Sequence, residues 1–160
     1  MQTDNKEKED KMVKVKGKIV AVCRSEKKGT VKKEISEGIL IKDFGLEKDA
    51  HSGKWHRQIS LLGIESINKM RDKGYQLSFG DFAENLAVEG MILYKLPIGT
   101  KLKVGDKALL EVTQIGKKCH YDCEIRKKIG DCVMPREGIF TRVLEGGKVK
   151  AGDEIEVLSE

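Results

Sequence analysis

Cys119 is the residue of this chain whose neighbours in the sequence most clearly favour chemistry. Residues 112–115 predict the end of a strand and residues 121–128 predict a helix, so Cys119 is expected at or just before the first helical turn. Free backbone N–H groups and the helix dipole stabilise negative charge there, and Lys117 and Lys118 add positive charge. Such surroundings lower a cysteine pKa to roughly 3.5–7.5. We therefore predict a thiolate that acts as a nucleophile or a soft metal ligand, the alternative being a small buried apolar residue.

The other cysteines leave a zinc site open as a weaker alternative. Cys119 and Cys123 are four residues apart and share one face of the predicted helix. Cys132 follows closely enough to return towards them, and His120 supplies an imidazole. Three thiolates and one imidazole satisfy a tetrahedral zinc ion, but structural zinc sites usually have paired Cys-x-x-Cys arms, and this segment has one looser pair. A structural zinc-binding module, or an iron–sulfur site, is thus a secondary hypothesis.

A polar loop at residues 49–57 holds a second group of candidates. It contains a carboxylate, two imidazoles and a guanidinium, which belong to Asp49, His51, His56 and Arg57. Binding residues are often found on such loops. The two histidines lack a familiar metal-ligand spacing, so hydrogen bonding within the loop is the alternative to zinc binding.

Residues 80–86 form a third segment with polar residues, and its Glu84 and Asn85 stand directly before the apolar residues 86–88. Glu84 and Asn85 are adjacent, and we expect one of them to face inward and to hydrogen-bond a neighbouring loop or a ligand. A structural hydrogen bond is the commoner use of such a pair.

The composition indicates one soluble, mildly basic domain. The 160 residues carry 31 basic and 26 acidic side chains, for a net charge of +5, and aromatic residues make up 5%. This small number of aromatic side chains argues against a platform for stacked bases. We therefore expect no nucleic-acid partner. The absence of an apolar run of about 20 residues and of a signal peptide predicts a cytoplasmic protein without a membrane partner. Cysteines in that compartment are expected as free thiols, ligands or redox groups.

Short apolar runs separated by glycines predict an all-β barrel or sandwich with small helices inserted. Residues 1–12 are expected to be a disordered tail and residues 13–160 the domain. Helical spacing of apolar residues predicts a short helix at about 64–71. Gly146 and Gly147 predict a hairpin-like turn between residues 139–144 and Val149. The strands are expected within residues 13–22, 31–41, 59–62, 107–115, 139–144 and 154–158.

Five ordered motifs resemble the MOSC domain, which takes its name from the C-terminal domain of molybdenum-cofactor sulfurases. The resemblance extends over about residues 14–158 and is closest to the small stand-alone bacterial type. The motifs are residues 45–51, 57–62, 80–86, 116–120 and 149–155.

This resemblance implies a mainly β, MOSC-like barrel with a few short helices, which binds molybdenum cofactor in its molybdopterin form. It implies that Cys119 is the metal ligand or a sulfur carrier. We further expect Cys119 and the polar loops to line a common cleft, for which a barrel mouth is the natural place. Arg57 and Arg142 are candidates for its phosphate, since a guanidinium presents paired donors to phosphate oxygens. The other candidates for cofactor binding are Asp49, His51, Glu84 and Asn85.

Two functional classes follow from the resemblance. In one, the loaded protein reduces N-hydroxylated substrates with electrons from an external donor. In the other, it carries cofactor, or sulfur on Cys119, to a receiving protein without turnover. The pyridoxal-phosphate-dependent portion of full sulfurases does not fit into 160 residues, so no pyridoxal phosphate is expected in this chain.

One residue departs from the family pattern. Lys48 stands where the family commonly has the glycine that precedes the first aspartate. If the backbone there has positive φ, a non-glycine residue costs roughly 1 kcal/mol.

Overall fold

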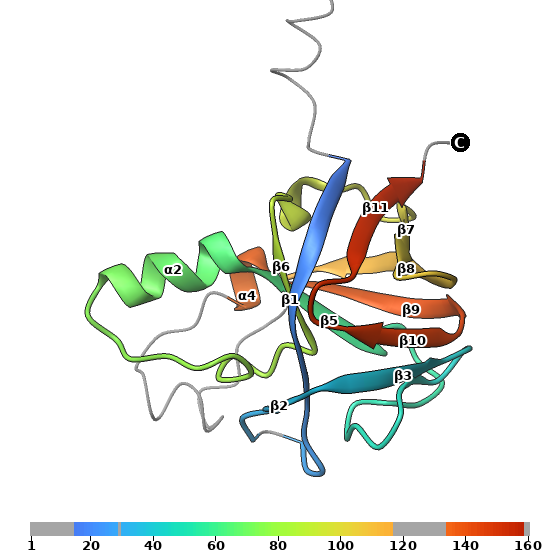
Figure 1. Cartoon of the computed structure of the whole chain (residues 1–160), viewed down its shortest axis with the longest axis horizontal. Coiled ribbons are helices and arrows are strands. Elements are labelled where there is room, and N and C mark those ends of the chain that lie inside the picture. The colour runs from blue at the N-terminus through green and yellow to red at the C-terminus, as the bar shows by residue number, and fades with distance from the viewer. Residues whose placement is uncertain (1–14, 29, 117–133, 159–160) are drawn as a thin grey trace, which may run out of the picture.

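The fold is a closed β-barrel of seven strands (Figure 1), which confirms the mainly β prediction. The computed structural model describes residues 15–28, 30–116 and 134–158. Neighbouring strands are antiparallel except β5 and β6, and pairing of β11 with β1 closes the ring. In order around the barrel, the strands are β1 (Lys16–Arg24), β6 (Leu86–Glu89), β5 (Ile59–Gly63), β9 (Ile139–Glu145), β8 (Ala108–Ile115), β7 (Lys101–Val104) and β11 (Glu154–Leu158).

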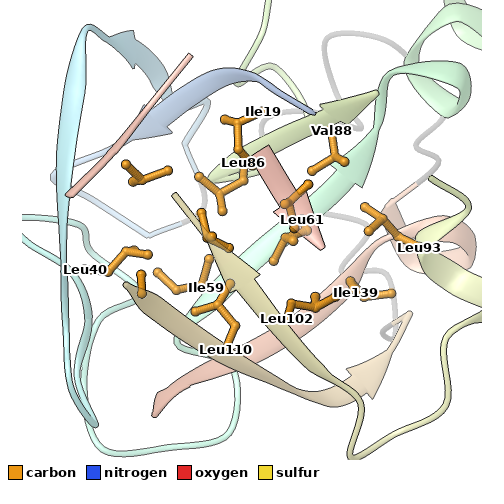
Figure 2. Packing of buried hydrophobic residues seen from close by; sticks show 14 of the residues in the cluster. Ile19, Leu40, Ile59, Leu61, Leu86, Val88, Leu93, Leu102, Leu110 and Ile139 are labelled. Atoms are coloured by element: carbon orange, nitrogen blue, oxygen red, sulfur yellow. The ribbon is translucent and has the colours of Figure 1, made fainter. Parts of the chain in front are cut away.

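Alternation along the strands separates two cores. Side chains such as Ile59, Leu61 and Leu86 point into the barrel and form the larger cluster (Figure 2). Their neighbours Leu62 and Ala87 belong instead to a second cluster on the outer face. Because both faces of β5 are covered, all five of its residues are buried. This explains why apolar residues occupy adjacent positions in its sequence, with Ser60 as the one polar side chain, instead of alternating with polar ones.

The outer cluster is covered by α2 (Ile64–Asp72), and this helix confirms the prediction at 64–71. Ile67 and Met70 lie on its buried face, three residues apart, as helical periodicity requires. The short α4 (Met134–Glu137) lies close to it, and Glu137 of α4 pairs with Lys69 at 3.0 Å. A single-turn 3-10 helix, η1 (Leu93–Lys95), precedes β7. Within the described segments, no helix is long and apolar enough to cross a membrane. The helix predicted at 121–128 lies outside the described residues.

A small sheet of β10 (Gly147–Lys150), β3 (Glu37–Ile41) and β4 (Gly45–Leu46) packs its buried side chains into the barrel cluster. The predicted hairpin at Gly146 and Gly147 is wrong, because β10 pairs with β3 rather than with β9. A Cβ atom on Gly146 would lie 2.5 Å from the carbonyl oxygen of Leu40, so glycine permits a close approach of two backbones there. One further strand, β2 (Lys33–Ile35), pairs with β1 outside the closed ring.

Candidate functional site

A buried ion pair joins Lys32 to Asp49 of the first polar loop (residues 49–57), and Lys32 also contacts the second (residues 80–86). The Lys32 Nζ atom is 2.7 Å from Asp49 Oδ1, and the two side chains are 1% and 0% exposed. Burial lowers the pKa of Lys32, and the Asp49 carboxylate opposes this effect. Losing one partner of such a pair is strongly destabilising, by about 3–5 kcal/mol, because the other charge stays buried.

Asp49 has further partners on both sides. Its Oδ1 accepts a bond from the backbone N–H of Ser25 at 3.0 Å, and its Oδ2 accepts one from the backbone N–H of His51 at 3.2 Å. The residue before it, Lys48, has φ of 65°, so the left-handed turn forms although glycine is absent. This turn directs Asp49 towards Lys32 and Ser25 rather than into solvent.

Glu84 is buried in the second polar loop and stabilises the backbone of that loop. Its Oε2 accepts the Gly80 N–H at 2.8 Å and its Oε1 accepts the Phe82 N–H at 3.1 Å. Burial raises the pKa of Glu84 to about 7, whereas those two N–H donors act in the opposite direction.

Lys32 also connects the two loops through its backbone. Its N–H donates to the Gly80 carbonyl at 2.8 Å. A Cβ atom on Gly80 would lie only 2.0 Å from the Lys32 carbonyl oxygen, and the φ of Gly80 is 92°. Only glycine fits at this point. The Asp49 loop and the Glu84 loop are therefore held against the same short segment.

Asn85 joins the loops to the barrel. Its Oδ1 accepts bonds from the Ser60 N–H at 2.9 Å and from the Ser60 hydroxyl at 3.1 Å. Its Nδ2 donates to the Cys23 carbonyl at 3.1 Å. The bonds of Lys32, Asp49, Glu84 and Asn85 together form one polar network. Since the parallel strands β5 and β6 begin next to Ser60 and Asn85 and the antiparallel β1 ends there, this network lies at one end of the three strands.

Arg57 lies between two aromatic rings. Its guanidinium carbon is 4.6 Å from the centre of the Trp55 ring and 5.5 Å from that of Phe140. Its Nε atom is buried and has no hydrogen-bond partner within the described part of the chain. The Trp55 indole in turn donates to the His51 carbonyl at 2.7 Å. A buried guanidinium donor without an acceptor is suited to bind an anionic group.

The first polar loop also contacts the strand that precedes Cys119. His56 Nε2 is 2.8 Å from Gln114 Oε1, and the Thr113 hydroxyl donates to the His56 carbonyl. The predicted ligand residues lie outside the described residues, and their roles stay predictions. They are Cys119, His120, Cys123 and Cys132.

Arg142 lies apart from this network. It is on β9, where its Nε donates to Glu111 Oε1 at 2.8 Å across the strand pair, and its side chain is 48% exposed. Its predicted contact with a phosphate is not tested by this geometry, but the guanidinium already has a structural partner.

A cleft of about 670 Å³ opens beside the network, where β1 turns towards β2. Ser25, which contacts both Lys32 and Asp49, lines this cleft. Its other lining residues are Arg24, Glu26, Lys27, Thr30, Val31, Lys33, Glu34 and Ile35. Among the described residues, no group of three or more His, Cys, Asp or Glu side chains could hold a metal ion. Within those residues, the network consists of hydrogen bonds and the Lys32–Asp49 ion pair.

Lys32 is the residue of this network that sequence reasoning missed. It is one of 31 basic residues and stands next to Lys33 in a polar stretch, where a solvated side chain is the ordinary expectation. Its burial depends on contacts with Asp49 and Gly80, which are far from it in the sequence, and no local pattern shows them.

Comparison with known proteins identifies relatives of the chain. A family model described as the MOSC domain matches residues 48–156. Among solved structures, the YuaD protein from Bacillus subtilis is similar at 24% identity with a TM-score of 0.77, covering 93% of this chain and 100% of that one. YiiM from Geobacillus stearothermophilus has 18% identity and a TM-score of 0.68, with coverage of 89% and 75%. YiiM from Escherichia coli has 19% identity and a TM-score of 0.65, with coverage of 92% and 71%. No curated protein sequence matches the chain.

Proposed function

Because the chain belongs to the MOSC domain family, we propose that it binds molybdenum cofactor and that Cys119 is the metal ligand or a sulfur carrier. The observation that carries the proposal is the family match over residues 48–156, which includes Cys119 and the two polar loops. The family is associated with molybdenum-cofactor binding. A cysteine thiolate is also the soft ligand that a sulfur-rich metal centre prefers.

Arg57 supports the phosphate side of this proposal. Its Nε is buried without a partner among the described residues, and two aromatic rings hold the guanidinium in place. Bound phosphate would satisfy that donor. Arg142 is the weaker candidate, because its Nε already donates to Glu111.

The remaining candidates for cofactor binding differ in the partners of their hydrogen bonds. As whole residues, Asp49, Glu84 and Asn85 are 6%, 0% and 1% exposed, and their side chains bond to the fold itself. In this proposal they keep the two loops in place around the cofactor, and the His51 imidazole approaches it. The cofactor, when bound, supplies the two-electron redox chemistry of its metal, and the protein residues bind it and exclude water.

We expect the loaded protein to reduce N-hydroxylated substrates with electrons from an external donor. Repeated turnover of an N-hydroxylated base, with reductant present, would distinguish this activity from the carrier function. A carrier would instead transfer cofactor or sulfur to a receiving protein once per chain and stop.

Substitution of Cys119 tests the proposal. Purified from a host that makes the cofactor, Cys119→Ser should lose molybdenum and bound sulfur while keeping a wild-type circular dichroism spectrum, because a hydroxyl is a poor soft ligand. Cys23→Ser is the matched control and should keep both, since Cys23 is 0% exposed and its burial raises the pKa of its thiol well above the ordinary value. Equal molybdenum and sulfur in Cys119→Ser and wild type would refute the assignment.

A further inference from the structure

The ammonium group of Lys32 is surrounded by three polar atoms at hydrogen-bond distance. Nζ lies 2.7 Å from Asp49 Oδ1, 3.1 Å from His51 Nδ1 and 3.3 Å from Ser25 Oγ. An ammonium group has three N–H donors and no acceptor. Each of its three protons therefore has one of these atoms as its partner.

The protons of the neighbours are consistent with this assignment. The Ser25 hydroxyl donates its single proton to the Lys27 carbonyl at 3.1 Å, so it presents a lone pair to Lys32. Asp49 Oδ1 accepts from the Ser25 N–H as well, as an ionised carboxylate does. The ion pair with Asp49, buried on both sides, favours the charged form of Lys32.

His51 must then accept a hydrogen bond at Nδ1, and a neutral imidazole that accepts at one nitrogen carries its proton on the other. We infer that Lys32 is a positioning residue that holds the His51 ring as the neutral tautomer with its proton on Nε2. In this state Nε2 would donate a hydrogen bond to an oxygen acceptor such as a phosphate. It is neither a base nor a metal ligand at that nitrogen.

The rigidity of Lys32 makes this control effective. Its backbone N–H is bonded to Gly80, and the close packing of Gly80 against the Lys32 carbonyl prevents the segment from shifting. The His51 backbone N–H is bonded to Asp49 Oδ2, so both ends of the Lys32 to His51 contact are fixed by the same carboxylate. The functional importance of the tautomer rests on the proposed cofactor site, but the tautomer itself does not.

Nitrogen-15 NMR of the imidazole rings in the full-length, cofactor-free chain tests the inference. The His51 signals are assigned by their loss in His51→Gln, and the experiment is run at a pH where the ring is neutral. We expect an unprotonated Nδ1 and a protonated Nε2. A proton on Nδ1 would overturn the inference, and it would do so even if molybdenum binding holds.

Variants of two adjacent lysines then identify the cause. Lys32→Met should shift the His51 Nδ1 resonance and give a mixture of tautomers, and Lys32→Arg, which keeps a cationic donor, should restore the wild-type signature. Lys33→Met, at the exposed neighbouring position, should leave it unchanged. If Lys32→Met retains the pure Nε2–H tautomer, Lys32 does not set it. Should that variant fail to fold, the wild-type and Lys32→Arg spectra still decide, because loss of the tautomer in a folded Lys32→Arg protein would also count against the inference.

Discussion

At the scale of single residues, burial decides what the polar side chains of the two loops can do. Lys32 and Asp49 remain an ion pair only because each satisfies the other and further bonds complete their coordination. Among the described residues, Glu84 has no ion-pair partner, and it instead accepts two backbone N–H bonds. Burial therefore favours protonation of Glu84, whereas the Asp49 carboxylate has the Lys32 ammonium group as its partner.

Glu84 should make stability depend on pH. Burial raises the pKa of its carboxyl group from the ordinary 4.5 to about 7. At this group the folded state then binds more protons than the unfolded state between these values, so the contribution of Glu84 to stability is fully present below about pH 4.5 and is lost as the pH rises to about 7. We predict a fall on the order of 3 kcal/mol from this group. Urea unfolding across this range should show the slope in wild type and in Glu89→Gln, an exposed control, but not in Glu84→Gln. An unchanged slope in Glu84→Gln would contradict the prediction.

The chemistry of individual residues was only partly predictable. Asp49, Glu84 and Asn85 stand out in the sequence because polar side chains interrupt apolar runs. One of Glu84 and Asn85 was expected to face inward, and both do. Lys32 gave no such signal, because its environment is created by residues that only the folded chain brings together. The position of Arg57 between Trp55 and Phe140 depends on a partner 83 residues away in the same way.

At the scale of elements, the connection between β4 and β5 is shaped by an unfavourable backbone angle. Lys48 adopts φ of 65°, where a Cβ atom is strained, and this turn places Asp49 beside Lys32. The cost is tolerated because the buried pair and the bonds of Asp49 depend on it. The departure from the family pattern at this position therefore leaves the left-handed turn intact.

Relief of this strain is measurable. Lys48→Gly should raise the free energy of unfolding by up to about 1 kcal/mol, since glycine adopts positive φ without a steric penalty. Lys54→Gly is the matched control in the same exposed connection, outside the left-handed region, and should lower stability slightly. Urea titrations of both variants and wild type provide the comparison. A loss of stability in Lys48→Gly as large as in Lys54→Gly would show that the turn is not strained.

Elements were predicted well where length and periodicity agreed. The strands β5, β8, β9 and β11 follow from strand-like segments of five to eight residues rich in apolar side chains, and the nine-residue α2 follows from apolar residues at helical spacing. The four-residue β7 and the two-residue β4 were missed because they are so short: β7 alternates over only two periods, and β4 has no pattern at all. The pairing of β10 was misread because Gly146 permits a close approach to Leu40 of β3, and Gly147 begins the strand that pairs with β3, rather than forming a hairpin.

At the scale of the whole molecule, the last strand closes the barrel around a single interior core. Ile155 of β11 lies opposite Gly17 of β1 and Val104 of β7, and it is 0% exposed. Ile155→Ala should therefore lower the free energy of unfolding by about 2–5 kcal/mol, because it leaves a cavity at the closure. Leu158→Ala, on the same strand but 37% exposed, should cost much less. Similar losses in the two variants would argue that β11 is not an integral part of the barrel.

The central claim is that this barrel holds molybdenum cofactor, and the most direct test is the molybdenum, pterin and zinc content of the wild-type protein. The protein should be purified without chelator from a host that makes the cofactor. Metal analysis and the fluorescence of the oxidised pterin should then give molybdenum and pterin in equal amounts, with zinc far below one ion per chain. Protein that contains one zinc ion per chain and neither molybdenum nor pterin would contradict the account and favour the structural zinc module.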